Sequence, residues 1–227
     1  MKILEEVHKK YTISSLENGK NNDTLLGMEQ QSRNNVTIER RTDRMKDIGV
    51  FFAPGFEEIE ALTVVDILRR AGLPVKMISV MNQKYETGSH QITVQTDQTL
   101  EETDFEQIDM IVLPGGQPGT KNLEACEPLM KQLDIFYKEK KYISAICAAP
   151  TILGHREMLK GRKACCYPGL EAQLADAQLS YAACVTDDFI TTGRGVGSAI
   201  SFACAIVERY QGRASSDKLA AAVVHTG

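Results

Sequence analysis

The chain has 227 residues, 43% of them hydrophobic, which is enough apolar material for one core-forming domain with an appendage. Its formal charge of −4 and sequence pI of about 5.7 argue against a basic surface for nucleic acid. The sequence has no run of about 18 apolar residues and no apolar segment of the secretory type at its start. We therefore expect no membrane interaction and a cytoplasmic protein.

The cysteines and histidines do not form a recognisable disulfide or metal pattern. Disulfide frameworks are typical of small secreted chains, so we expect the thiols of this larger chain to be reduced. No CxxC motif occurs and the four histidines are scattered, so we predict no metal site. The six cysteines are Cys126, Cys147, Cys165, Cys166, Cys184 and Cys204.

Residues 1–44 differ in composition from the rest of the chain. They are polar, rich in asparagine, and contain neither proline nor cysteine. We interpret them as a disordered or loosely structured extension of a domain over residues 45–227. Met45 directly precedes the first strand pattern, which raises the hypothesis that translation starts there.

From residue 46 onward, apolar runs and amphipathic segments alternate along the chain. The apolar runs predict strands at 47–53, 74–80, 108–113, 142–147 and 163–167, a hairpin around Gly88 and Ser89, and two strands within 183–193. Helical periodicity and stop signals predict helices at 57–71, 127–141, 197–211 and 216–224. This alternation is typical of an α/β fold with a doubly wound, mostly parallel sheet and helices on both faces.

Three segments follow predicted buried strands, namely "APGFEE", "LPGGQPG" and "AICAAP". Ligands bind such sheets outside the carboxyl ends of the strands, so these segments are the candidate site. In "AICAAP", a sharp turn from strand to helix at Cys147 holds the sulfur at the sheet edge. There, the following N–H groups and the helix dipole favour the thiolate. The alternative is a buried, inert cysteine, and position alone leaves both interpretations open.

The two other segments offer groups that act on such a thiol. The backbone N–H groups of Gly115 and Gly116 form an oxyanion hole with that of Ala148 in one interpretation, and a simple tight turn in the other. "PGFEEIE" places Glu57, Glu58 and Glu60 in or near a first helical turn, where the helix dipole stabilises carboxylates in any case. Helical spacing does not decide which of the three faces the thiol.

A histidine base for Cys147 is not expected within this chain. His155 lies eight residues further along the predicted helix, which is roughly 12 Å away at the usual helical rise. His90 and His225 have no positional reason to approach. A cysteine–glutamate pair remains. Because two adjacent negative charges repel, we expect the pair to share one proton or the glutamate to be protonated. We interpret the adjacent Cys165 and Cys166 as packing residues on opposite faces of a strand.

The motifs "APGFEEIE", "VLPGG" and "AICAAP", in this order, resemble the ThiJ/PfpI superfamily. The resemblance is strongest to the branch of the human parkinsonism-associated deglycase and its bacterial relatives. It extends over about residues 46–212, including "VVDILRRAG" and "TTGRGVGSAISFACAIVE". It implies a flavodoxin-like homodimer without a cofactor, with Cys147 as the reactive cysteine and Glu60 as its partner. Gly115, Gly116 and Ala148 would supply backbone N–H groups.

The sequence departs from the family pattern at three places. Tyr167 stands where the human branch has a histidine, and tyrosine is a poor base near neutral pH. The family's serine-arginine-glycine-proline segment is Gly193-Arg194-Gly195-Val196 here. Ala148 stands where the protease-like branch has a histidine, which argues against a peptidase.

The resemblance implies two functions for this cysteine. The first is a glutathione-independent glyoxalase or protein deglycase, a hydrolase-like enzyme that removes methylglyoxal or its early adducts in carbonyl and oxidative stress. Its partner is then a small aldehyde or a glycated protein. The second is a non-enzymatic redox sensor or chaperone that uses oxidation of the same cysteine.

Overall fold

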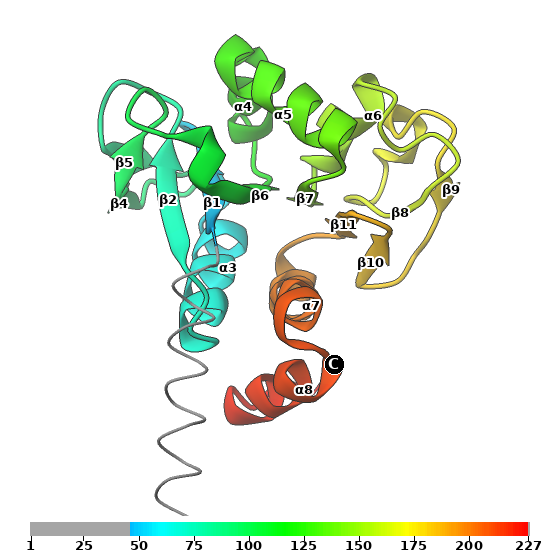
Figure 1. Ribbon diagram of the computed structural model, residues 1–227. Coiled ribbons are helices and arrows are strands. Elements are labelled where there is room, and N and C mark those ends of the chain that lie inside the picture. Colours follow the sequence, from blue (N-terminus) through cyan, green and yellow to red (C-terminus); the bar gives the residue numbers. More distant parts are fainter. Residues whose placement is uncertain (1–45, 227) are drawn as a thin grey trace, which may run out of the picture. The chain divides into compact units, whose positions relative to one another are not determined.

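The structure is a computed structural model that describes residues 46–226. The predicted N-terminal extension, residues 1–44, and the hypothesis of a start at Met45 lie outside the described residues. The described part contains a central sheet with helices on two faces, as Figure 1 shows. No helix within residues 46–226 is both long and apolar enough to cross a membrane.

The central sheet has seven strands in the order β10-β11-β7-β6-β1-β2-β5. Neighbouring strands run parallel except β10 and β11, which form an antiparallel pair at one edge. The strands are β1 (Asp47–Phe52), β2 (Val75–Ser79), β5 (Gln98–Thr99), β6 (Ile108–Leu113), β7 (Tyr142–Ile146), β10 (Cys184–Asp187) and β11 (Ile190–Gly193). Two small pairs lie outside it: β3 (Tyr85–Thr87) with β4 (Thr93–Gln95), and β8 (Lys163–Ala164) with β9 (Gln178–Leu179).

The helices cover the sheet in two layers. In Figure 1, α4, α5 and α6 lie on one face, and α3, α7 and α8 lie on the other. Their bounds are α3 (Glu58–Arg70), α4 (Gly119–Ala125), α5 (Glu127–Glu139), α6 (Pro150–His155), α7 (Ala199–Gln211) and α8 (Arg213–Ala222). Three short 3-10 turns are at Phe105–Gln107, Glu171–Gln173 and Val196–Ser198. This is the doubly wound α/β arrangement of flavodoxin-like proteins that the sequence predicts.

Each face of the sheet has its own hydrophobic core. Alternate residues of β1 point to opposite faces, so Phe51 packs in one core, whereas Ile48 and Phe52 pack in the other. Helix α5 buries Leu133 and Phe136 in the first core. In the second core, α3 and α7 bury Ala61, Val64, Leu68, Phe202 and Val207. These cores fix the strands whose ends carry the candidate site.

Most predicted elements are confirmed, and the differences are local. The helix after Cys147 begins only at Pro150 and has six residues, and α4 was not predicted. The strand in "KACCY" ends at Ala164 and pairs outside the central sheet, so Cys165 and Cys166 are buried beyond it. The Cys165 N–H donates to Thr192 Oγ1 at 3.0 Å, a tertiary contact that replaces strand pairing there.

Candidate active site

The three segments of the candidate site meet at one edge of the sheet. They follow β1, β6 and β7, which are consecutive in the sheet order β7-β6-β1. Because these strands are parallel, their carboxyl ends lie side by side. The sequence prediction that these segments share one edge is confirmed.

Cys147 is held in an uncommon backbone conformation directly after β7. Its φ of 65° is left-handed, which a non-glycine residue adopts at a cost of about 1–3 kcal/mol when the surroundings enforce it. Two hydrogen bonds enforce it here. The Cys147 N–H donates to Gly193 O at 2.9 Å, and the Cys147 carbonyl accepts from Tyr167 N at 2.7 Å. The half-buried thiol is therefore fixed between the ends of two strands and the 165–168 segment.

Glu60 lies beside this thiol from the first turn of α3. Its side chain is fully buried, and Oε2 accepts a hydrogen bond from Gly115 N at 3.0 Å. Within the described residues, its other oxygen, Oε1, has no hydrogen-bond partner. A Cβ added at Gly115 would lie 2.6 Å from both Cys147 Cβ and Glu60 Oε2. Only glycine fits at this point, because the two side chains meet there.

The protonation of the pair follows from its burial. Burial raises the pKa of Glu60 to about 7. Hydrogen bonds from the Cys147 thiol and the Gly115 N–H favour the ionised carboxylate and partly oppose this increase. Burial also raises the pKa of the Cys147 thiol, and the Glu60 charge raises it further. Ionised Glu60 therefore disfavours the thiolate, so the pair keeps one proton above about pH 7, which agrees with the expectation that the two groups share one proton.

The thiolate is favoured less by its surroundings than the sequence predicts. The helix dipole is a weak contributor, since α6 has six residues and begins three residues after the sulfur. Two N–H groups lower the thiol pKa instead, those of Ala148 and Gly116, but burial and Glu60 outweigh them. The Gly115 N–H is directed to Glu60 rather than to the sulfur, so it orients the acid. The donors at the sulfur are Gly116 and Ala148.

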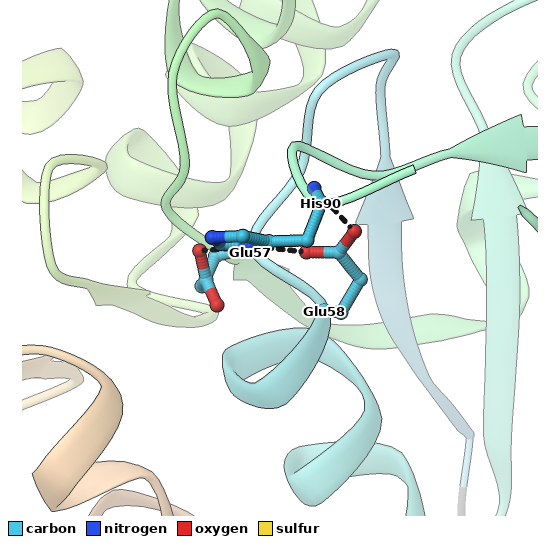
Figure 2. A group of neighbouring side chains, drawn as sticks. All are labelled: Glu57, Glu58 and His90. Atoms are coloured by element: carbon cyan, nitrogen blue, oxygen red, sulfur yellow. Dashed lines mark hydrogen bonds and ion pairs between the residues drawn. The ribbon is translucent and has the colours of Figure 1, made fainter. Parts of the chain in front are cut away.

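Glu57 and Glu58 face another part of the molecule. Figure 2 shows both side chains beside His90, which belongs to the loop of the β3–β4 hairpin. Glu58 accepts from the His90 N–H at 2.7 Å and lies 2.9 Å from His90 Nδ1, and it also accepts from Ile92 N at 3.4 Å. Glu57 Oε2 is 3.5 Å from His90 Nδ1. Helical spacing did not decide which of the three glutamates faces the thiol. In the structure, Glu57 and Glu58 face the β3–β4 hairpin.

Glu57, Glu58 and His90 are also a group of potential metal ligands, because their ligand atoms lie within 4.8 Å of one another. The Glu58 oxygens, however, already accept hydrogen bonds from the hairpin loop. The hydrogen bond to Glu58 and the two acidic charges raise the pKa of His90. The arrangement is explained by an ion pair that anchors the loop.

The histidines of the described region have partners away from the thiol. His155 Nδ1 lies 2.7 Å from Glu124 Oε1, and His225 Nε2 lies 2.9 Å from Ser201 Oγ. His90 pairs with Glu58. This agrees with the expectation that none of these three is a base for Cys147.

A cavity beside the thiol contains residues to which the sequence analysis gave no role. It has a volume of about 620 Å³ and is lined by Tyr167, Pro168, Ala183, Arg194, Gly195, Val196, Gly197 and Ser198. Most of these follow β11, which is the neighbour of β7 in the sheet. The sequence analysis predicted no strand order, and the adjacency of β11 and β7 is the signal that would have found these residues.

Comparisons with known proteins agree on one family. The family model described as DJ-1/PfpI matches residues 46–209. Protein DJ-1 homolog B of Arabidopsis thaliana is 32% identical over 173 residues, 76% of this chain and 40% of that protein. Glutathione-independent glyoxalase DJR-1.2 of Caenorhabditis elegans is 30% identical over 165 residues, 72% of this chain and 87% of that protein.

Solved structures of DJ-1 proteins also resemble this chain. The oxidized DJ-1 of Toxoplasma gondii superposes with a TM-score of 0.76 at 31% identity, covering 80% of this chain and 100% of that one. The chain spans about two fifths of the length of the two Arabidopsis relatives, homologs A and B. It spans most of the Caenorhabditis relative.

Proposed function

Because the chain belongs to the DJ-1/PfpI family, we propose that it converts methylglyoxal, or its early adducts on proteins, to lactate without a cofactor. The observation that carries the proposal is the Cys147–Glu60 pair, a half-buried thiol beside a fully buried carboxyl whose pKa is about 7. Such a pair provides a nucleophile and a proton carrier at physiological pH. The relative named as a glutathione-independent glyoxalase supports the choice of substrate.

The reaction requires one nucleophile and one group that moves protons. The Cys147 sulfur adds to the aldehyde carbon, and the new oxyanion is stabilised by the N–H groups of Gly116 and Ala148. Glu60 takes the proton from the former aldehyde carbon and returns it to the ketone carbon. This oxidises the first carbon to a thioester and reduces the second to an alcohol. Water then hydrolyses the thioester, which releases lactate and restores the thiol.

Glu60 suits this role because its carboxyl interacts with the Cys147 thiol and because its Oε1 has no hydrogen-bond partner among residues 46–226. A methyl group added at Gly195 would lie 3.8 Å from Oε1 and 3.9 Å from Cys147 Sγ, so both atoms face the same space. A substrate bound to the sulfur there is within reach of the carboxyl. Peptidase activity is not proposed, since Ala148 occupies the position of the protease-like branch's histidine.

Lactate formation from methylglyoxal tests the proposal. We expect wild type to form lactate and Cys147→Ala to form none above the uncatalysed rate. Cys126→Ser is the matched control, because Cys126 is a partly exposed cysteine at the start of α5 and should leave the rate unchanged. Equal rates in wild type and Cys147→Ala would refute the role of Cys147.

The same site supports a second candidate function, a redox sensor. The unpartnered Glu60 Oε1, when protonated, can donate a hydrogen bond to an oxidised sulfur. Two molecules of hydrogen peroxide convert the thiol to a sulfinic acid and leave two molecules of water. Under mild peroxide, mass spectrometry should then find two added oxygens on Cys147 before any other cysteine. Indiscriminate oxidation of the six cysteines would contradict this function.

We also propose a cytoplasmic homodimer. All six cysteines are free thiols, which suits a reducing compartment. Ile59 at the start of α3 is 53% exposed, and so is Ile92 in the hairpin loop. The Ile92 N–H lies 3.4 Å from Glu58 Oε1, so the two apolar side chains come from adjacent segments that a second copy would cover. Light scattering should give twice the chain mass, and Ile59→Asp should give the monomer mass.

A further inference from the structure

From the cavity beside Cys147, we infer that the preferred substrate carries a negatively charged group several bonds from its aldehyde, and that Arg194 binds this group. The inference rests on the proposed function and narrows it to a class of substrate, the 2-oxo aldehydes with a carboxylate tail.

The cavity and the space in front of the sulfur share two border residues. Tyr167 and Gly195 line the cavity. The same two residues border the reacting groups, since a methyl group added at Gly195 would lie 3.5 Å from Tyr167 Cδ2 and 3.9 Å from Cys147 Sγ. These are ordinary van der Waals separations, so a group of methyl size fits between Gly195 and the sulfur without a clash. A substrate bound to the sulfur therefore extends past Gly195 into the cavity.

The volume of the cavity exceeds what the smallest substrate needs. At about 620 Å³ it falls in the range of pockets that hold drug-sized ligands. Methylglyoxal has only a methyl group beyond its two carbonyls and leaves most of this space empty. The walls from Pro168 and Val196 are apolar and suit a short methylene chain between the aldehyde and a second end.

The charge at the cavity comes from Arg194. Within residues 46–226, no carboxylate lies within the 4.0 Å of an ion pair with Arg194, whereas five arginines have such partners: Arg69, Arg70, Arg156, Arg162 and Arg213. The Arg194 guanidinium is nevertheless held in place. It donates to Tyr181 O at 3.2 Å and lies 5.9 Å from the Tyr181 ring. Among the described residues, it is thus a positioned cation without an anionic partner.

The position of this charge indicates the length of the ligand. Burial raises the pKa of the thiols of Cys165 and Cys166, and the Arg194 charge opposes this at both. The Arg194 guanidinium contacts Tyr181, whereas the neighbouring Gly195 borders the reacting sulfur, so the charge lies to the side of that sulfur. A guanidinium binds a carboxylate through two parallel hydrogen bonds, so a tail of a few methylene groups ending in a carboxylate fits.

The test compares 4,5-dioxopentanoate with its methyl ester, which has the same reacting end and no charge. The reaction adds one water and converts the acid to 2-hydroxyglutarate, with the aldehyde carbon oxidised and the ketone carbon reduced. We expect kcat/KM for the acid to exceed that for the ester by about tenfold or more, the usual worth of a charge-assisted hydrogen bond. Arg194→Gln should bring the ratio to about one, and Arg194→Lys should keep part of the preference.

A binding measurement separates this inference from the proposed function. Cys147→Ala cannot react, so calorimetry on it compares the affinities of the acid and the ester directly, with Cys147→Ala/Arg194→Gln as the matched control. If wild type turns over neither methylglyoxal nor these two compounds but Cys147→Ala prefers the acid through Arg194, the inference stands and the proposed function fails. Equal affinities, or a preference that Arg194→Gln retains, overturn the inference, even where methylglyoxal turnover supports the function.

Discussion

Glu58 and Glu60 lie two residues apart at the start of α3, are both buried, and differ in almost every other respect. Glu58 accepts hydrogen bonds from the hairpin loop, and although burial raises its pKa, those bonds lower it on balance. Glu60 accepts one backbone N–H and has one oxygen without a partner, so burial prevails and raises its pKa to about 7. Two acids with little exposed surface thus differ in role: Glu58 is a structural carboxylate, whereas the more deeply buried Glu60 is a proton carrier.

The comparison shows that depth of burial and hydrogen-bond supply together set the role of an acid. A carboxylate surrounded by donors is stable as an ion and contributes to the fold. A carboxyl with too few donors is destabilised as an ion, and it keeps a proton that chemistry can use. The following predictions test this contrast in order of decreasing effect.

The largest expected difference is in catalysis. Glu60→Gln keeps the size of the side chain and removes proton transfer, so we expect the rate of lactate formation to fall by about 10²–10⁴-fold. Glu58→Gln is the matched control and should change the rate far less, because Glu58 faces the hairpin. Similar losses in the two variants would show that the contrast between the acids has no catalytic meaning.

The second difference is in stability. The folded-state pKa of Glu60 is raised from 4.5 to about 7, so the folded state binds more protons in this window and loses stability as pH rises through it. Glu60→Gln removes this loss. We expect its free energy of unfolding to exceed that of wild type by roughly 3 kcal/mol above pH 7 and to match wild type below pH 4.5. Urea unfolding at both pH values measures this, and destabilisation at alkaline pH would contradict it.

The Glu58→Gln substitution should change the free energy of unfolding in the opposite direction from Glu60→Gln, and by less. Its amide cannot accept all the hydrogen bonds of the carboxylate, so we expect a loss of about 1–3 kcal/mol of unfolding free energy near neutral pH. The pKa of Glu58 is lowered in the folded state, so its contribution is present above the unfolded pKa and is lost as pH falls through the folded pKa. Urea unfolding as a function of pH should show the two variants converging with wild type in acid.

The sequence predicted the strands, the shared sheet edge and the position of Cys147, because these depend on local apolar patterns and turns. It did not separate Glu58 from Glu60 by spacing, since the distinction comes from the hairpin loop, which the backbone bonds Ser89 N–Phe56 O and Gly55 N–Thr87 O hold near α3. The resemblance to a family was needed to choose Glu60.

The raised pKa of the thiol was also outside the reach of sequence reasoning. It arises from burial by segments distant in sequence, and the expected helix dipole is weak because α6 is short. The cavity at Arg194 was missed for a similar reason. It depends on β11 lying next to β7, and strand order in a sheet is a property of the whole fold.

The central claim, that Cys147 and Glu60 share one proton, is tested most directly by the pH dependence of Cys147 alkylation with iodoacetamide. In wild type, Glu60 ionises at about pH 7 and its charge raises the pKa of the Cys147 thiol, so the alkylation rate should stay low through pH 7 and rise only well above the ordinary cysteine pKa. In Glu60→Gln, this charge is absent, so the rise should occur at lower pH than in wild type. The same inflection in both proteins, or an inflection in wild type at the ordinary cysteine pKa of about 8.5, would contradict the claim.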